Sequence, residues 1–96
     1  MTDQLGEVLQ ERSDRYGNFM DRSAITQSIK HAMASEGWNR LACDQKEALE
    51  TIAVKIARIL NGDPDYADNW IDIAGYAMLV VDRLKDNSQQ PQEPLQ

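Results

Sequence analysis

Four acidic residues between positions 47 and 72 stand at spacings that could hold a metal ion. Glu47 and Glu50 lie three residues apart in one stretch with helical periodicity, and Asp68 and Asp72 lie four apart in the next. Residues three or four apart share one face of a helix, so each pair presents two carboxylates together. Carboxylates bind Mg²⁺, and bound Mg²⁺ activates phosphates toward attack by water. We therefore expect a magnesium site in which Glu50 and Asp72 are the catalytic members.

The same carboxylates have structural interpretations that stay open. Residues 44–47, "DQKE", resemble a capping box with Glu47 at the third helical position, and Glu50 fits a solvated helix face. Asp68 is favourable near the N-terminus of a helix, where the backbone dipole is positive. Asp72 lies well inside its helix among apolar neighbours, which favours a ligand contact or a buried ion pair.

Basic and aromatic residues could supply the complementary site for phosphates. "ERSDRYGNF" places two arginines and a tyrosine beside a chain reversal, and guanidinium forks with an aromatic face suit a nucleotide. The alternative is a turn with exposed arginines. Two further basic residues lie one turn apart on the third helical stretch, where they could neutralise phosphates or pair with Asp68 or Asp72. We expect ligand contacts from five residues: Arg12, Arg15, Lys55, Arg58 and Tyr76.

The spacing of the apolar residues predicts four helices, on which these residues lie. No stretch shows the alternation of apolar and polar residues that is typical of a β-strand. The first helix breaks at Gly17 and Asn18, where Asn18 or Asp21 begins the second. The sequence therefore predicts an all-α bundle of about four helices over residues 1–85. Residues 86–96, rich in Gln and Pro, are expected to form a disordered tail.

The fourth helix has two distinct faces. Its expected core stripe consists of Trp70, Ile73, Ala74, Ala77, Val81 and Leu84. The opposite line holds Asp68, Asp72, Tyr76, Leu79 and Arg83, which is too apolar for a purely solvated face. We expect this second line to meet another helix, a second subunit or a ligand.

Composition excludes several classes of function. The net charge of −6 and the absence of a Lys/Arg run argue against binding of duplex DNA or RNA. The single Cys43 suits a reducing cytoplasm, and no stretch fits a membrane span or a signal peptide. A folded part of this size gains stability by self-association, so a homo-oligomer is expected. Antiparallel packing of the last two helices would separate the acidic pairs, unless a partner subunit brings them together.

Two segments resemble a family of small phage and prophage proteins of undefined function. They are "LQERSDRYGNF" and "QKEALETIAVKIARILNGDPDYADNWIDIAGYAML", and the match runs over about residues 7–84. The most specific part is the motif Asp68–Trp70–Asp72–Gly75–Tyr76. The resemblance implies an all-α protein that works in the cytoplasm of a bacterial host.

More distantly, the chain is similar to MazG-like nucleotide pyrophosphohydrolases, whose pattern is E-x-x-E, a spacer and E-x-x-D. Glu47 and Glu50 match the first half and Asp72 the last position, whereas Asn69 stands where the fourth acid is expected. This resemblance implies a bundle built from two or more subunits, with Mg²⁺ held at a triphosphate.

Two functions follow as hypotheses. The first is a MazG-like nucleotide-binding protein that could act as a magnesium-dependent nucleoside triphosphate pyrophosphohydrolase. The second is a non-catalytic anti-defence protein that sequesters a nucleotide signal or inhibits a host defence protein by direct binding. The uncharged Asn69 favours the second class.

Overall fold

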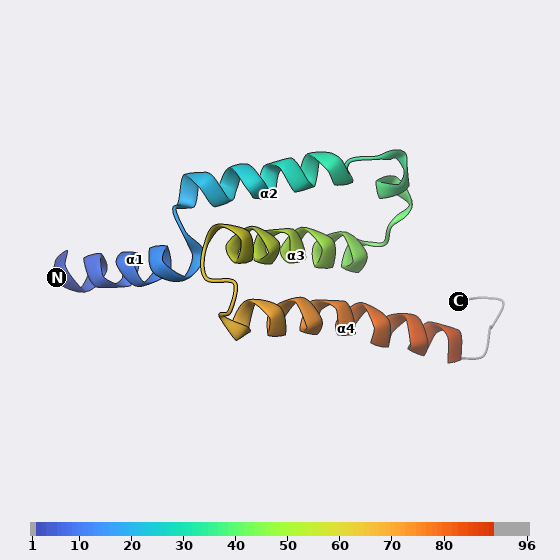
Figure 1. Ribbon diagram of the computed structural model, residues 1–96. Coiled ribbons are helices and arrows are strands. Elements are labelled where there is room, and N and C mark those ends of the chain that lie inside the picture. The colour runs from blue at the N-terminus through green and yellow to red at the C-terminus, as the bar shows by residue number, and fades with distance from the viewer. Residues whose placement is uncertain (1, 90–96) are drawn as a thin grey trace.

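The computed structural model describes residues 2–89, in which all the regular secondary structure is helical, with no strand. The four α-helices are α1 (Thr2–Tyr16), α2 (Phe19–Met33), α3 (Cys43–Asn61) and α4 (Ala67–Gln89), and a short 3-10 helix, η1 (Glu36–Arg40), joins α2 to α3. The prediction of an all-α protein with four helices is confirmed. α2 and α4 lie on opposite sides of α3, and α1 projects beyond one end of this layer (Figure 1).

The break between α1 and α2 falls where the sequence predicts it. Gly17 has a φ of 78°, a left-handed conformation that glycine adopts without steric cost. The Asn18 side chain then caps α2 by accepting hydrogen bonds from the backbone N–H groups of Met20 and Asp21. These two residues therefore end α1 and begin α2, and the two helices run in roughly the same direction (Figure 1).

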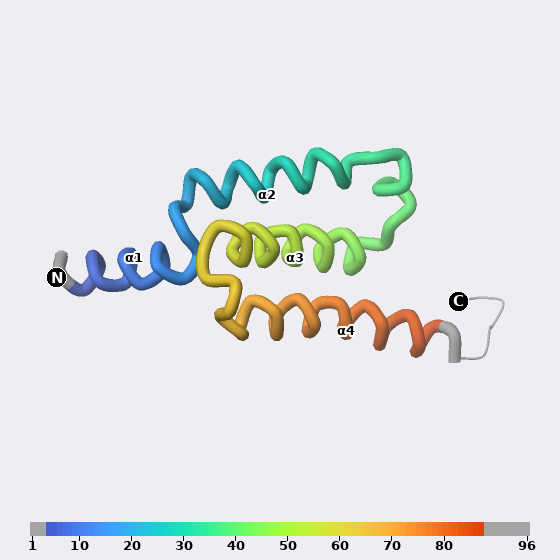
Figure 2. The backbone as a smooth tube through the Cα atoms, in the orientation of Figure 1, coloured from blue at the N-terminus to red at the C-terminus, as the bar shows by residue number. Residues whose placement is uncertain are grey.

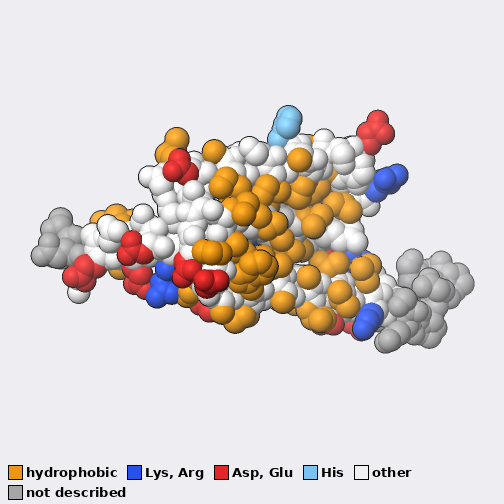
Figure 3. All heavy atoms as spheres, viewed as in Figure 1, with side chains coloured by type: hydrophobic (Ala, Val, Ile, Leu, Met, Phe, Trp, Pro, Cys, Tyr) orange, Lys and Arg blue, Asp and Glu red, His pale blue; other side chains and the backbone are white. Residues whose placement is uncertain are grey.

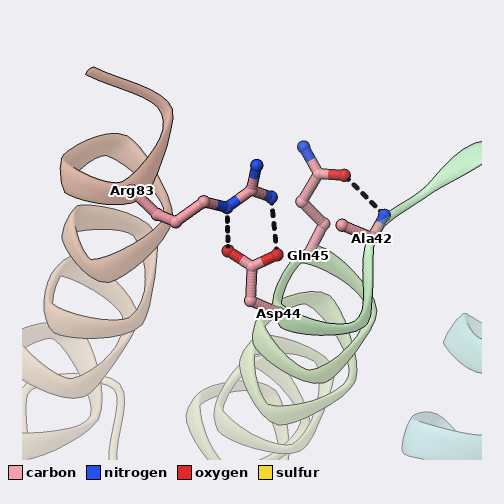
Figure 4. A network of polar contacts seen from close by, with 4 residues as sticks. All are labelled: Ala42, Asp44, Gln45 and Arg83. Carbon is pink, nitrogen blue, oxygen red and sulfur yellow. Dashed lines mark hydrogen bonds and ion pairs between the residues drawn. The ribbon is translucent and has the colours of Figure 1, made fainter. Parts of the chain in front are cut away.

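The start of α3 differs from the predicted capping box. The helix begins at Cys43, so Gln45 occupies the third helical position and its Oε1 accepts a hydrogen bond from Ala42 N at 2.8 Å (Figure 4). Asp44 instead accepts two hydrogen bonds from Arg83 of α4, with Nε–Oδ2 and Nη2–Oδ1 distances of 2.9 and 2.6 Å. The prediction that Glu47 completes a capping box is wrong, because the helix starts earlier than residue 44.

The helical layer is held together around small side chains. Ala48, Ala53 and Ala57 of α3 are the buried apolar residues among those described, and they let α2 and α4 approach α3 closely. Thr26 and Asn69 are the buried polar residues in the same part of the chain. The larger aliphatic side chains are mostly left at least partly exposed, so the layer itself has little core.

α4 is oriented differently from the sequence expectation. Asp72 and Arg83, on the predicted second line, contact α3, whereas Trp70, on the predicted core stripe, is 54% exposed. The predicted burial of Trp70, Val81 and Leu84 is therefore wrong for the single chain. The expectation that the second line meets another helix is correct for Asp72 and Arg83, and that helix is α3.

The ends of the chain add two observations. α4 continues to Gln89, beyond the expected limit of the folded part at residue 85. Residues 90–96 of the expected tail lie outside the described residues. Within residues 2–89, no helix combines the length and apolar character needed to cross a membrane.

Candidate functional site

Two glycine turns cross at one end of the helical layer and hold it together. The turn after α1 lies against the turn between α3 and α4 (Figure 2). Asp63 N donates to Arg15 O at 2.8 Å, and Asn61 Nδ2 donates to Asn18 O at 2.9 Å. A Cβ at Gly17 would collide with the Asn61 backbone, and one at Gly62 with the Arg15 backbone. Glycine is therefore required at both positions for this close approach.

This crossing builds a pocket of about 360 Å³ that we call the arginine pocket. The Arg58 guanidinium lies over the Tyr16 ring at 4.3 Å, and the Arg15 guanidinium lies over the Tyr66 ring at the same distance. The two rings are 6.3 Å apart, centroid to centroid. The lining residues come from α1, α3 and the segment before α4: Val8, Glu11, Arg12, Arg15, Tyr16, Arg58 and Tyr66.

The charge of the arginine pocket is opposite to that of the whole chain. Three arginines line it and one acid, Glu11, which pairs with Arg15 at 3.3 Å. Arg22 adds a fourth cation nearby, 5.8 Å from the Tyr16 ring. Burial, and then the positive charges of Arg58 and Arg12, lower the pKa of Arg22. These neighbouring cations repel one another, and an anion would relieve that repulsion.

Two of these guanidinium groups keep unused hydrogen-bonding capacity. The Nε atoms of Arg22 and Arg58 are buried and have no hydrogen-bond partner among the described residues. Unmade hydrogen bonds of buried charged groups are costly, and such groups gather at functional sites. Arg58 therefore combines a fixed stacking position with incomplete hydrogen bonding.

The predicted phosphate-binding residues divide between different places. Arg12, Arg15 and Arg58 meet in the arginine pocket, although they are far apart in the sequence. Lys55 instead forms an ion pair with Asp72, with 3.0 Å between Nζ and Oδ2. Tyr76 lies farther along α4, where it lines separate hollows beside Asp72 and beside Glu47.

The predicted metal ligands are held by different partners. Glu50 pairs with Lys30 of α2 at 3.7 Å, whereas Asp72 pairs with Lys55 across the α3–α4 contact. Asp68 accepts a hydrogen bond from the Tyr66 hydroxyl at 2.8 Å, and this bond raises the pKa of Tyr66.

Magnesium does not fit the acids of one chain. Over residues 2–89, no group of three or more His, Cys, Asp or Glu side chains gathers closely enough to hold a metal ion. Asn69, at the fourth position of the MazG-like pattern, is 2% exposed and is therefore not an accessible ligand. The paired lysines neutralise Glu50 and Asp72, which would also weaken their attraction for a cation.

Two residues at the arginine pocket are not indicated by the sequence patterns. Tyr66 belongs to the turn before the fourth helix, and Arg22 belongs to the second helix, and neither stands in a recognisable motif. Both positions become meaningful only when the two glycine turns cross. The signal that could have indicated them is the Arg-Tyr-Gly sequence at residues 15–17 together with the Asn-Gly turn at residues 61–62.

Comparison with known proteins gives one match. Neither the curated proteins nor the solved structures contain one that matches the chain. Residues 3–84 match a family described as "Domain of unknown function (DUF6378)", so that the match covers all four helices except their outermost ends. The chain therefore belongs to the DUF6378 family.

Proposed function

We propose that the protein binds a nucleotide or a related phosphorylated ligand in the arginine pocket. The observation that carries the proposal is the meeting of Arg12, Arg15 and Arg58 with two tyrosines in a chain whose net charge is −6. Clustering of arginines does not make an acidic protein more soluble, because solubility depends on the net charge. A cluster of guanidinium groups is, however, well suited to bind the oxygens of a phosphate. The pocket volume lies within the range of small-molecule sites, about 300–1,000 Å³.

Each part of the arginine pocket has a role in this proposal. Guanidinium groups bind phosphate oxygens through paired hydrogen bonds, and stacking on Tyr16 and Tyr66 fixes Arg58 and Arg15 before the ligand arrives. The planar aromatic and guanidinium surfaces also suit stacking of a nucleobase. Binding without cleavage is favoured, because the described acids of a single chain do not gather around a metal.

The biological setting that we propose is sequestration of a nucleotide signal in a bacterial cytoplasm. The support is the resemblance of "LQERSDRYGNF" and the Asp68–Tyr76 motif to phage proteins. A protein that captures a signal needs affinity and no turnover, and a preformed arginine site meets that requirement. Cyclic oligonucleotides are therefore the first ligand class to test, beside ribonucleoside and deoxyribonucleoside triphosphates.

Isothermal titration calorimetry tests the binding proposal directly. The wild-type protein is titrated with each ligand in EDTA, with inorganic phosphate as a further ligand to separate phosphate binding from nucleotide binding. Arg12→Gln and Arg58→Gln should each weaken binding roughly tenfold to a hundredfold, the equivalent of one lost charge-assisted hydrogen bond. Circular dichroism confirms that the variants keep their helices.

Arg40→Gln is the matched control, because Arg40 lies on η1 at the opposite end of the layer (Figure 1). It removes the same charge and should leave the dissociation constant unchanged. An equal loss of affinity in Arg12→Gln, Arg58→Gln and Arg40→Gln would show that binding depends only on non-specific electrostatic attraction. Absence of saturable binding for every ligand class would overturn the proposal.

Magnesium-dependent release of pyrophosphate is the second function that we propose to test. It rests on the similarity to MazG-like enzymes and requires an oligomer, in which a second protomer supplies further acids. Asp68 and Glu47 are both exposed, so they remain accessible to a partner. Pyrophosphate formed with Mg²⁺ and abolished in Glu50→Gln and Asp72→Asn would support it. Intact ligand recovered after heating the complex would support sequestration, and absence of both would leave inhibition of a host defence protein by direct binding.

A further inference from the structure

The helices of the layer leave one face of α3 uncovered. α2 and α4 flank α3 on opposite sides, and η1 lies at the end of the layer (Figure 1). Stable domains usually bury the apolar sides of their helices between two packed layers. The described chain supplies a single layer, because α1 projects away from it.

The uncovered face is apolar. At 100° per residue, Leu49, Ile52, Ile56 and Leu60 of α3 fall within a sector of about 80°. A hollow of about 280 Å³ opens beside Leu49 and Ala77 of α4, and one of about 510 Å³ opens beside Leu60 and Ile29 of α2. Figure 3 shows apolar side chains spread over all three helices. We call this surface the apolar face: Ile29, Leu49, Ile52, Ile56, Leu60 and Ala77.

α4 continues the apolar face on one side. Trp70, Val81 and Leu84 lie on the same stripe of α4 as Ala77, and all three are exposed. Contacts of Asp72 and Arg83 with α3 fix α4 in this orientation. The apolar stripe of α4 therefore stays exposed, because the polar contacts with α3 lie on the other side of α4.

The exposed area is larger than a monomer of this size requires. The accessible surface is 7315 Å², whereas a folded monomer of 10.9 kDa exposes about 5,600 Å². The difference is about 1,700 Å² for one chain, which is more than the roughly 800 Å² that each partner buries in a stable dimer. The radius of gyration of 17.4 Å likewise exceeds the roughly 13 Å of a compact chain of about 100 residues.

The charge distribution favours a second copy as the occupant. The chain carries a net charge of −6, so two copies repel each other at most surfaces. The residues that line the two hollows of the apolar face include no charged side chain. Two copies can meet there without opposing like charges, whereas a basic partner would find no acid to pair with.

We propose that a second copy of this chain covers the apolar face, so that the folded unit is a dimer of two helical layers. A two-fold axis places the α3 helices of both copies against each other and buries the same residues twice. The proposal goes beyond nucleotide binding and does not depend on it. Arg58 lies nine residues after Leu49, half a helical rotation away, so the arginine pocket faces away from the partner layer.

Sedimentation equilibrium of the wild-type chain tests this proposal in the micromolar range. The expected mass is twice that of the 10.9 kDa chain. Leu60→Glu places a charge on the apolar face and should raise the dimer dissociation constant at least about tenfold. Leu60 is 68% exposed within one chain, so the substitution does not disturb the packing of the layer itself.

Leu79→Glu is the matched control, because Leu79 is 65% exposed but lies on the opposite side of α4 from Trp70. It introduces the same charge and should leave the dissociation constant unchanged. Circular dichroism at the same concentrations distinguishes dissociation from unfolding, and helix loss in Leu60→Glu alone would show that the layer folds only as a dimer. A wild-type mass of one chain would overturn the proposal, as would equal dissociation of both variants.

Discussion

The structure requires a glycine at position 17 but not at position 75. Gly17 has a positive φ and touches the Asn61 backbone, so Gly17→Ala should destabilise the protein by at least about 2 kcal/mol. Gly75 lies inside α4, where an added Cβ would meet no atom within 4 Å, so Gly75→Ala should stabilise the protein by about 0.5–1 kcal/mol. Urea unfolding measures both changes. Equal effects of the two substitutions would contradict the crossing of the glycine turns.

The Asp44–Arg83 pair makes a pH-dependent contribution to stability. Hydrogen bonds from Arg83 hold the pKa of Asp44 below its ordinary value of about 3.9. Because the folded-state pKa is depressed, the contribution is fully present above that ordinary value and is lost as the pH falls through the folded-state pKa. Asp44→Asn should therefore lower the unfolding midpoint in urea at pH 7 and have progressively less effect below about pH 4.

Arg83→Gln, which removes the other partner, should show the same dependence on pH. A difference from the wild type that stays the same size as the pH falls from 7 through the acidic range would contradict this assignment, because protonation of Asp44 removes the ion pair.

At the residue scale, the sequence predicts which side chains are candidates for phosphate binding but not which of them meet. Arg12, Arg15 and Arg58 are predicted together and lie together. Lys55 is predicted with them and instead pairs with Asp72, a structural use that the sequence leaves open. Lys55 and Arg58 have different partners because the rotation of α4 about its axis brings Asp72 to Lys55. The spacing of the two basic residues on α3 does not specify that rotation.

At the scale of helices, the contact between α3 and α4 depends on a partly buried ion pair. Lys55 is 14% exposed, whereas Asp72 remains partly open to solvent. Asp72→Ala leaves the Lys55 ammonium without its partner and should cost about 1–2 kcal/mol, discounted for solvent at the carboxylate. Lys55→Met keeps the apolar stem and removes the buried charge, so it should cost less. Thermal and urea unfolding of both variants measure the comparison.

The same two variants distinguish an ion pair from a metal site. If Asp72 acts through Lys55 alone, added Mg²⁺ should leave the unfolding midpoint of the wild type and of Lys55→Met unchanged. A rise with Mg²⁺ that Asp72→Ala abolishes would contradict the structural assignment, because a ligand that binds the folded state stabilises it.

Helix existence can be predicted more reliably than helix orientation. The turn at Gly17 and Asn18 follows from residue types alone, since left-handed glycine and asparagine caps are local properties. The exposure of Trp70 cannot be predicted in this way. Hydrophobic periodicity shows which residues favour burial, but it does not show whether the same chain or a partner covers them. The polar contacts of Asp72 and Arg83 with α3 decide the orientation.

At the scale of the whole molecule, the protein combines one open apolar face with one cationic pocket. The apolar face lies along α2, α3 and α4, and the arginine pocket lies at the end where the glycine turns cross. Because the two surfaces are separate, the self-association and the ligand binding that we propose would not compete with each other. The single chain has almost no core of its own among the described residues. It nevertheless places four arginines near each other at the end where the glycine turns cross.

The most direct test of the central claim, ligand binding in the arginine pocket, is an NMR titration of the arginine Nε–Hε resonances. Each arginine gives its own signal, and Arg58 and Arg22 lie at the pocket whereas Arg83 is bound to Asp44. On addition of a nucleotide, the Arg58 and Arg22 signals should shift together and saturate, while the Arg83 signal stays in place. Signals that shift uniformly without saturation, or a saturable shift at Arg83 alone, would contradict the account.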